Sequence, residues 1–451
     1  MVPIVQSAER LTVDQKDVGS SPTGHPGRWL QGHFLFWLLL LLMTACGLEM
    51  PAAPTAFATQ PLPSASPIAP PSPTPSPVPP TMTPSPLEGL RIVYSTPGGL
   101  WLWQAGQTRP LTSSAADSDP RFSPDGEWLT FQRDQTLWGL HVQDGEARPL
   151  VTPDYLSLIA PDQKLRLGAF AWMPGTSNLF FTTLQRTPQG WEPRFDLHVV
   201  DARLGQPLLI LPNGSGGIPF FSPRGAWLAL VRAGEIALTA TPSLKPRHVF
   251  AFKPLPNFLP TLHWLRDESG FVFLLPPDPS QATPTPEPSS PYPALLPTQW
   301  WGISIEGKAR RLGEFEAETF SIATPVVSPN GDQLLYLYPY RKRGQHEIHI
   351  RDVLGNDLFY TSYRYGKIAP LTWLPDELHF IYWADSPQSL WLAHYGEPAR
   401  PLVTDLSIDA LLLADETFFI FRHGSEIFLQ TWKGERLLLI QGSGEDVDVF
   451  R

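Results

Sequence analysis

From Leu90 to the end of the chain, short apolar segments alternate with polar turns, and the pattern recurs. The clearest copy runs from Asp119 to Thr152, where turn residues separate successive apolar stretches. Short runs rich in aromatic and branched residues, bounded by Gly, Pro, Asp and Ser, are typical of β-strands. The pattern predicts an all-β domain built from repeats of four strands.

A tight turn precedes the second strand of every repeat after the first. Ser123-Pro124-Asp125-Gly126 has the residues of a type I turn, in which Ser accepts a hydrogen bond, Pro fixes φ and Gly releases the chain. The turn recurs at Ser222 to Gly225 and Ser328 to Gly331, and weaker copies stand at Met173 to Gly175, Arg266 to Gly270, Leu374 to Glu377 and Ala414 to Glu416. Successive turns are roughly 40 to 60 residues apart, the range of four-stranded propeller blades.

The chain contains eight such repeats, and the first lacks its innermost strand. Asp446 to Phe450 is a strand left over after the eighth repeat. Pairing this strand with the first repeat satisfies two edges that would otherwise be exposed. We therefore predict a single β-propeller of four-stranded antiparallel blades over residues 89–451, closed by the C-terminal strand, with eight blades favoured over seven.

The segment from Pro120 to Phe131 reads Pro-x-Phe-Ser-Pro-Asp-Gly-x-x-Leu-x-Phe, and it resembles the WD-repeat-like propeller of the TolB type. The resemblance covers nearly all of residues 90–451, with strong motifs in three blades, and it implies a ring of blades. In TolB an α/β domain precedes the ring. A proline-rich segment stands in its place here, so the resemblance does not carry a role in Tol transport to this chain.

Residues 1–45 have the pattern of a secretion signal with an atypically long leader. Phe34 to Ala45 is an apolar run of twelve residues, whereas a bilayer core needs about 20, and Arg28 supplies a positive flank. Leu42 to Cys46 resembles the bacterial lipoprotein signal, in which the cysteine becomes acylated, although Met43 departs from the usual Leu, Val or Ile. We expect lipidation of Cys46 and attachment to the extracytoplasmic side of the cell membrane.

Two other interpretations of this region stay open. Cys46 is an ordinary buried thiol in one, and Trp29 to Leu48 is an uncleaved membrane anchor in the other, although Gln31 and His33 weaken that stretch. The long leader also leaves open a later translation start, at Val13 or Val18.

Residues 46–88 have the composition of a proline-rich, disordered linker. No charged residue occurs from Pro51 to Leu87, and the chain contains 53 prolines. Proline fixes φ and removes a backbone donor, so an extended polyproline II stalk is expected. The alternative is a ligand for proline-binding modules, and a spacer is favoured because the segment begins at an anchor.

Charge and cysteine content narrow the function classes. The net charge of −10 argues against a nucleic-acid partner, which would require a basic face. With Cys46 as the one cysteine, an intrachain disulfide and a cysteine-based zinc site are excluded.

The long connections of the predicted propeller fall on one face, after second strands and between blades. They are Pro153 to Gly168, Thr183 to Phe195, Pro276 to Pro297 and Pro339 to His346. Long loops on a rigid scaffold commonly carry binding sites, and aromatic residues and Arg are common interface anchors. The candidate binding residues are Tyr155, Trp191, Arg194, Tyr292, Tyr340, Arg341, Lys342, Arg343 and His346, and a solvated loop surface is the alternative.

The sequence favours a monomeric binding scaffold without cofactors, with a protein or glycan partner at the long-loop face. It contains no Gly-x-Ser-x-Gly elbow and no His-Glu-x-x-His metal motif, and these are the signatures of common hydrolases. The alternative is a propeller hydrolase or lyase that acts on an extracellular polysaccharide or peptide.

Overall fold

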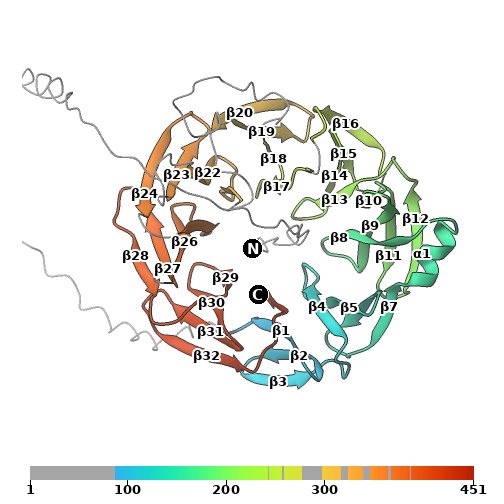
Figure 1. The fold of residues 1–451 in the computed structure, drawn as a ribbon, viewed down its shortest axis with the longest axis horizontal. Helices are drawn as coiled ribbons and strands as arrows, with labels where there is room; N and C mark the ends of the chain where they lie inside the picture. Colours follow the sequence, from blue (N-terminus) through green and yellow to red (C-terminus); the bar gives the residue numbers. More distant parts are fainter. Residues whose placement is uncertain are drawn as a thin grey trace, which may run out of the picture. The chain divides into compact units, whose positions relative to one another are not determined.

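The computed structural model describes residues 87–241, 243–255, 258–276, 297–315, 324–338, 346–363, 367–385 and 388–451. These residues form a closed ring of β-sheets (Figure 1). Residues 1–86, which contain the expected signal, Cys46 and nearly all of the expected linker, lie outside the described residues. Within the described part, no helix has the length and apolarity required to cross a membrane.

The ring contains eight sheets, which confirms the predicted blade number. From the centre outward, blade 1 holds β33 (Val447–Phe450), β1 (Arg91–Thr96), β2 (Gly99–Gln104) and β3 (Gln107–Pro110). Blade 2 holds β4 (Asp117–Phe122), β5 (Trp128–Arg133), β6 (Thr136–His141) and β7 (Ala147–Val151). Blade 3 holds β8 (Leu165–Trp172), β9 (Asn178–Thr187), β11 (Leu197–Asp201) and β12 (Gln206–Leu211). Blade 4 holds β13 (Ile218–Phe221), β14 (Trp227–Arg232), β15 (Glu235–Ala240) and β16 (Pro246–Ala251).

The second half of the ring repeats this order. Blade 5 holds β17 (Leu262–Trp264), β18 (Gly270–Leu275), β19 (Thr298–Ser304) and β20 (Ala309–Phe315). Blade 6 holds β21 (Val326–Val327), β22 (Gln333–Tyr338), β23 (His346–Asp352) and β24 (Asp357–Tyr363). Blade 7 holds β25 (Ile368–Trp373), β26 (His379–Asp385), β27 (Gln388–His394) and β28 (Arg400–Val403). Blade 8 holds β29 (Ala410–Ala414), β30 (Phe418–His423), β31 (Glu426–Thr431) and β32 (Arg436–Gln441).

The Ser-Pro-x-Gly turns join first and second strands, as the sequence predicts. In blade 2 the Gly126 N–H donates to Ser123 O at 2.8 Å, and the Trp128 N–H donates to Ser123 Oγ at 3.0 Å. Gly126 has a φ of 69°, a backbone conformation that favours glycine. In blades 2, 4 and 6 the serine hydroxyl accepts the N–H at the start of the second strand and helps to fix where that strand begins.

The C-terminal strand closes the ring. β33 pairs with β1 in antiparallel register, with Arg91 opposite Phe450. Asp448 Oδ2 accepts a hydrogen bond from the Phe122 N–H of β4 at 2.7 Å, so the last strand also contacts blade 2. The predicted closure is confirmed.

Large side chains of the second strands fill the space between neighbouring blades. Phe131, Phe181 and Phe273 are at most 1% exposed. Val272 of blade 5 packs in one cluster with Leu334 and Tyr336 of blade 6. Each such buried apolar side chain stabilises the fold by roughly 1.5–3 kcal/mol, and the packing of neighbouring blades gives the loops a rigid base.

Candidate functional site

Blade 3 departs from the common four-stranded plan at two places. The seven-residue helix α1 (Pro153–Ile159) lies in the connection from blade 2, and the Thr152 hydroxyl caps it by accepting the Tyr155 N–H at 3.2 Å. The extra strand β10 (Gly190–Pro193) follows β9, which has ten residues where β5 has six. Both additions fall in connections that the sequence marks as long, and both were expected there as loops.

The second half of β9 extends past its pairing with β11. This half of β9 pairs with β8 on one side and with β10 on the other. Arg166 lies opposite Leu184, and Trp191 lies opposite Arg186. The register begins with Leu165 opposite Gln185, and the Arg186 N–H donates to Lys164 O at 3.0 Å, which extends it by one pair. Residues directly opposite in antiparallel strands point to the same side of the sheet. One side therefore presents Lys164, Arg166, Leu184, Arg186, Trp191 and Pro193, and we call it the basic face.

The other side of this three-stranded sheet is packed against the molecule. Leu165 and Leu167 lie there, and both pack with Tyr155 against the buried cluster shared by blades 2 and 3. Because a strand alternates its side chains between two sides, burying these two leucines directs Lys164 and Arg166 outward. Both cations are exposed.

Trp191 organises the arginines of the basic face. The guanidinium carbon of Arg166 lies 4.6 Å from the centre of the Trp191 ring, and that of Arg186 lies 5.7 Å from it. Both distances are within the range of cation–π attraction. Arg166 is exposed as a whole residue, but partial desolvation and then the neighbouring charge of Arg186 hold its pKa below the ordinary value.

Several arginines of the chain have a carboxylate within ion-pair distance, and the cations of the basic face do not have one among the described residues. Arg133 contacts Asp117 at 2.6 Å, Arg203 contacts Asp201 at 2.9 Å and Arg436 contacts Asp405 at 2.8 Å. By contrast, the side chains of Lys164, Arg166 and Arg186 form no hydrogen bond or ion pair with any residue that the structure describes. In a chain with 43 acidic and 33 basic residues, this is an unneutralised basic site.

A buried polar cluster holds the base of the hairpin formed by β9 and β10. Asp196 accepts two hydrogen bonds from Thr183, from its N–H at 2.8 Å and from its hydroxyl at 2.5 Å. His198 Nε2 lies 3.2 Å and Arg194 Nε 3.7 Å from Asp196 Oδ2. Burial opposes ionisation of Asp196, but the contacts with His198 and Thr183 outweigh it and hold the pKa of Asp196 below its ordinary value.

Tyr155 extends this cluster towards α1. Its hydroxyl lies 2.7 Å from His198 Nδ1, and the His198 ring stacks on Phe181. Burial, with a smaller contribution from the charge of Asp196, raises the pKa of Tyr155 to about 12. Tyr155 is therefore a neutral hydrogen-bonding partner at neutral pH, and its geometry supports the hairpin.

The connection between blades 3 and 4 closes tightly over the same base. The Gly216 N–H donates to Phe195 O at 2.6 Å, and a Cβ on Gly216 would lie 2.4 Å from the Asp196 carbonyl carbon. Phe195 itself has a φ of 53°, which is unusual for a residue with a side chain. These features redirect the chain from β10 into β11.

The structure separates the candidate residues of the sequence analysis into different surroundings. Trp191 lies on the basic face, whereas Tyr155 and Arg194 belong to the buried base, where the Arg194 side chain is 13% exposed. Tyr292, Tyr340, Arg341, Lys342 and Arg343 lie outside the described residues, as does the side chain of His346 at the start of β23. Lys164, Arg166, Arg186, Asp196 and His198 are not among the candidate residues predicted from the sequence.

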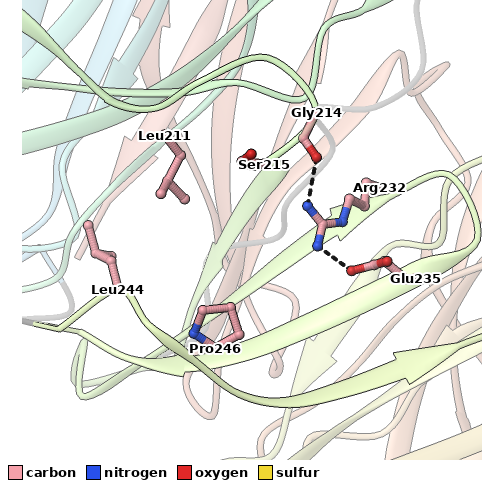
Figure 2. Close-up of a pocket in the computed structure, with 7 residues that line it drawn as sticks. All are labelled: Leu211, Gly214, Ser215, Arg232, Glu235, Leu244 and Pro246. Atoms are coloured by element: carbon pink, nitrogen blue, oxygen red, sulfur yellow. Dashed lines mark hydrogen bonds and ion pairs between the residues drawn. The ribbon is translucent and has the colours of Figure 1, made fainter.

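A groove on the rim between blades 3 and 4 is a second candidate (Figure 2). It has a volume of about 550 Å³ and is lined by Leu211, Gly214, Ser215, Arg232, Glu235, Leu244 and Pro246. Arg232 donates to Gly214 O at 2.9 Å and forms an ion pair with Glu235. Because Glu235 already neutralises the guanidinium of Arg232, the groove attracts an anionic ligand less strongly than the basic face does.

We also searched the described part of the chain for a metal site. There, no three His, Cys, Asp or Glu side chains are grouped so that they could hold a metal ion. The basic face and its buried base are therefore the best-defined candidate site.

Comparisons with known proteins identify a fold. No protein-family model matches the chain, and no curated protein matches it in sequence. A crystal structure of the eukaryotic initiation factor is similar over 79% of this chain and 85% of its own, with a TM-score of 0.51 and 12% identity. TolB from Acinetobacter baumannii matches with a TM-score of 0.30 and 15% identity, over 60% of this chain and 63% of its own. The β-propeller domain of the Trilobed protease from Pyrococcus furiosus matches with a TM-score of 0.40 and 14% identity, over 62% of this chain and 86% of its own. At these identities the likeness concerns the fold alone.

Proposed function

We propose that this chain is an extracytoplasmic lipoprotein, anchored through Cys46, whose β-propeller is a binding scaffold. In this proposal residues 46–88 hold the ring away from the membrane, and the long-loop face binds the partner. The anchor rests on the sequence from Leu42 to Cys46, and the binding function rests on blade 3.

The observation that supports binding most strongly is the three-stranded extension of β8, β9 and β10. Ring closure requires four strands from each blade, and β10 is additional to them. The extension is held by a buried carboxylate with two hydrogen bonds from Thr183, and it presents charged side chains without counter-charges. Functional residues are frequently held in this way by a rigid supporting shell.

A site-specific cross-linking experiment tests which face binds. A photoreactive residue replaces Gln189, between β9 and β10, or Lys433, between β31 and β32, and both positions are exposed. Connections after second strands and after third strands open on opposite faces of a propeller, so the two positions probe opposite faces. We expect covalent adducts in cells from position 189 and none from 433; adducts confined to position 433 would contradict the proposal.

The anchor is tested independently by fractionation. Cys46→Ser removes the acyl acceptor, and we expect the variant to remain as an unprocessed precursor or to leave the membrane fraction. Retention of a cleaved, acyl-free form with the membrane would show that another element anchors the chain.

A further inference from the structure

We infer that the basic face binds an acidic segment of a partner protein, through carboxylates that pair with Arg166 and Arg186. This inference rests on the proposed function and adds the chemistry of its ligand. It uses the side chains of Lys164, Arg166, Leu184, Arg186, Trp191 and Pro193, which the strand register places on one side of the sheet.

Charge is the first step of the argument. Arg166 and Arg186 each have a guanidinium within 6 Å of the centre of one indole ring, and Lys164 lies next to Arg186 across the strand pair. The charge of Arg186 acts unfavourably on Arg166, and no carboxylate among the described residues lies within ion-pair distance of Lys164, Arg166 or Arg186. An anionic ligand gains electrostatic energy on binding, and opposite charge also raises its rate of association.

The second step is preorganisation. A free arginine loses rotamer entropy when it binds a ligand, and this loss reduces affinity. Stacking on Trp191 restricts both guanidinium groups before any ligand arrives. A planar guanidinium then offers a pair of parallel N–H donors that match the two oxygens of a carboxylate.

The third step concerns the class of ligand: the surroundings of Trp191 favour a protein segment over an acidic glycan. Leu184 and Pro193 complete the basic face with aliphatic surface, which the aliphatic parts of a peptide can cover. The Trp191 ring, to which a sugar ring would stack, already has two guanidinium groups over it. Arginine and tryptophan together are also enriched at the centres of protein interfaces.

Backbone pairing contributes little to this binding. β10 is a four-residue edge strand that ends at Pro193, and proline lacks the N–H donor that an added strand would need. The ligand is therefore recognised by side chains, and binding is expected to depend strongly on salt.

The test uses the full chain carrying Cys46→Ser and two fluorescent peptides of alternating Glu and Leu or Gln and Leu. Fluorescence anisotropy gives the Kd at low and high salt, with polygalacturonate as a competitor. The test variant is Arg166→Gln with Arg186→Gln. The matched control is Arg203→Gln with Arg436→Gln, which removes the same charge from arginines that already have carboxylate partners.

We expect the Glu peptide to bind and the Gln peptide not to bind. In the test variant the Kd for the Glu peptide should rise about tenfold for each arginine lost. The control variant should bind like the parent, and both variants should keep the parent's melting temperature. Equal binding by test and control variants would overturn the inference, as would binding of polygalacturonate without binding of the Glu peptide. If position 189 cross-links in cells but the Glu peptide does not bind, the inference fails while the proposed function stands.

Discussion

The Thr183 hydroxyl donates to Asp196 Oδ2 at 2.5 Å, while the Thr183 N–H donates to Asp196 Oδ1 at 2.8 Å. This two-point contact joins β9 to the residue that precedes β11, at the level where β10 begins to replace β11 as the neighbour of β9. The hairpin of β9 and β10 therefore leaves the ring at a fixed point. We therefore expect the position of Trp191 and Arg186, which lie on this hairpin, to depend on that contact.

Asp196→Ala tests the support of the hairpin. The substitution leaves Arg194 and His198 without the carboxylate that lies beside them. Losing one partner of a buried ionic cluster typically lowers the free energy of unfolding by about 3–5 kcal/mol. We expect a reduced free energy of unfolding in urea, with faster hydrogen exchange over residues 184–193. Asp201→Ala, which removes the carboxylate of a surface pair with Arg203, should cost less than about 1 kcal/mol. Equal effects of the two substitutions would show that the buried cluster is not what holds the hairpin.

Acid should weaken the same contact. The pKa of Asp196 is lower in the folded chain than its ordinary value, which is about 3.9 in the unfolded chain. Asp196 therefore contributes stability above about pH 4, and the contribution is lost as pH falls through the folded pKa. Melting temperatures from pH 7 to pH 2 should fall less steeply in Asp196→Asn than in the parent. Parallel curves would mean that Asp196 does not titrate in this range.

Asp448 should show the opposite sign. Burial in the seam between β33 and β4 outweighs the hydrogen bond from the Phe122 N–H and raises the pKa of Asp448. Its ionisation therefore destabilises the folded chain as pH rises above about 4. Asp448→Asn keeps an oxygen acceptor for Phe122, and we expect it to melt above the parent at pH 7. That difference should shrink below pH 4; a variant less stable than the parent at neutral pH would contradict this assignment.

Removal of Glu445 to Arg451 tests the ring closure. The deletion removes β33, exposes the inner edge of β1 and takes away the contact of Arg451 with Asp415. Exposed edge strands promote association. We expect a lower melting temperature and larger species in size-exclusion chromatography. A monomeric product with the parent's melting temperature would mean that the ring does not need its closing strand.

The repeated features of the fold are those that the sequence predicts well. Ser123 and Gly126 determine a turn through local hydrogen bonds, and the strand after the turn contains the aromatic residues that are buried between blades. The terminal strand was also recognisable, because the first repeat lacks an innermost strand. Each of these signals lies within a short segment or recurs along the chain.

The candidate site was harder to predict because it depends on strand register. Arg166 and Arg186 are twenty residues apart in the sequence, and a bulge between Leu167 and Phe170 shifts the pairing of β8 with β9. Only the actual register places both arginines beside Trp191. The same applies to Thr183 and Asp196, whose contact also requires the left-handed turn at Phe195.

Hydrogen exchange with bound ligand tests the central claim most directly, since it reports which face of the propeller is covered. The Cys46→Ser chain is compared with and without a saturating concentration of the Glu-containing peptide. We predict slower exchange over residues 164–167 and 184–193, with no change at the turns from Ser123 to Gly126 and from Ser328 to Gly331. Protection of those turns with none in residues 184–193 would show that the opposite face binds and would contradict the account.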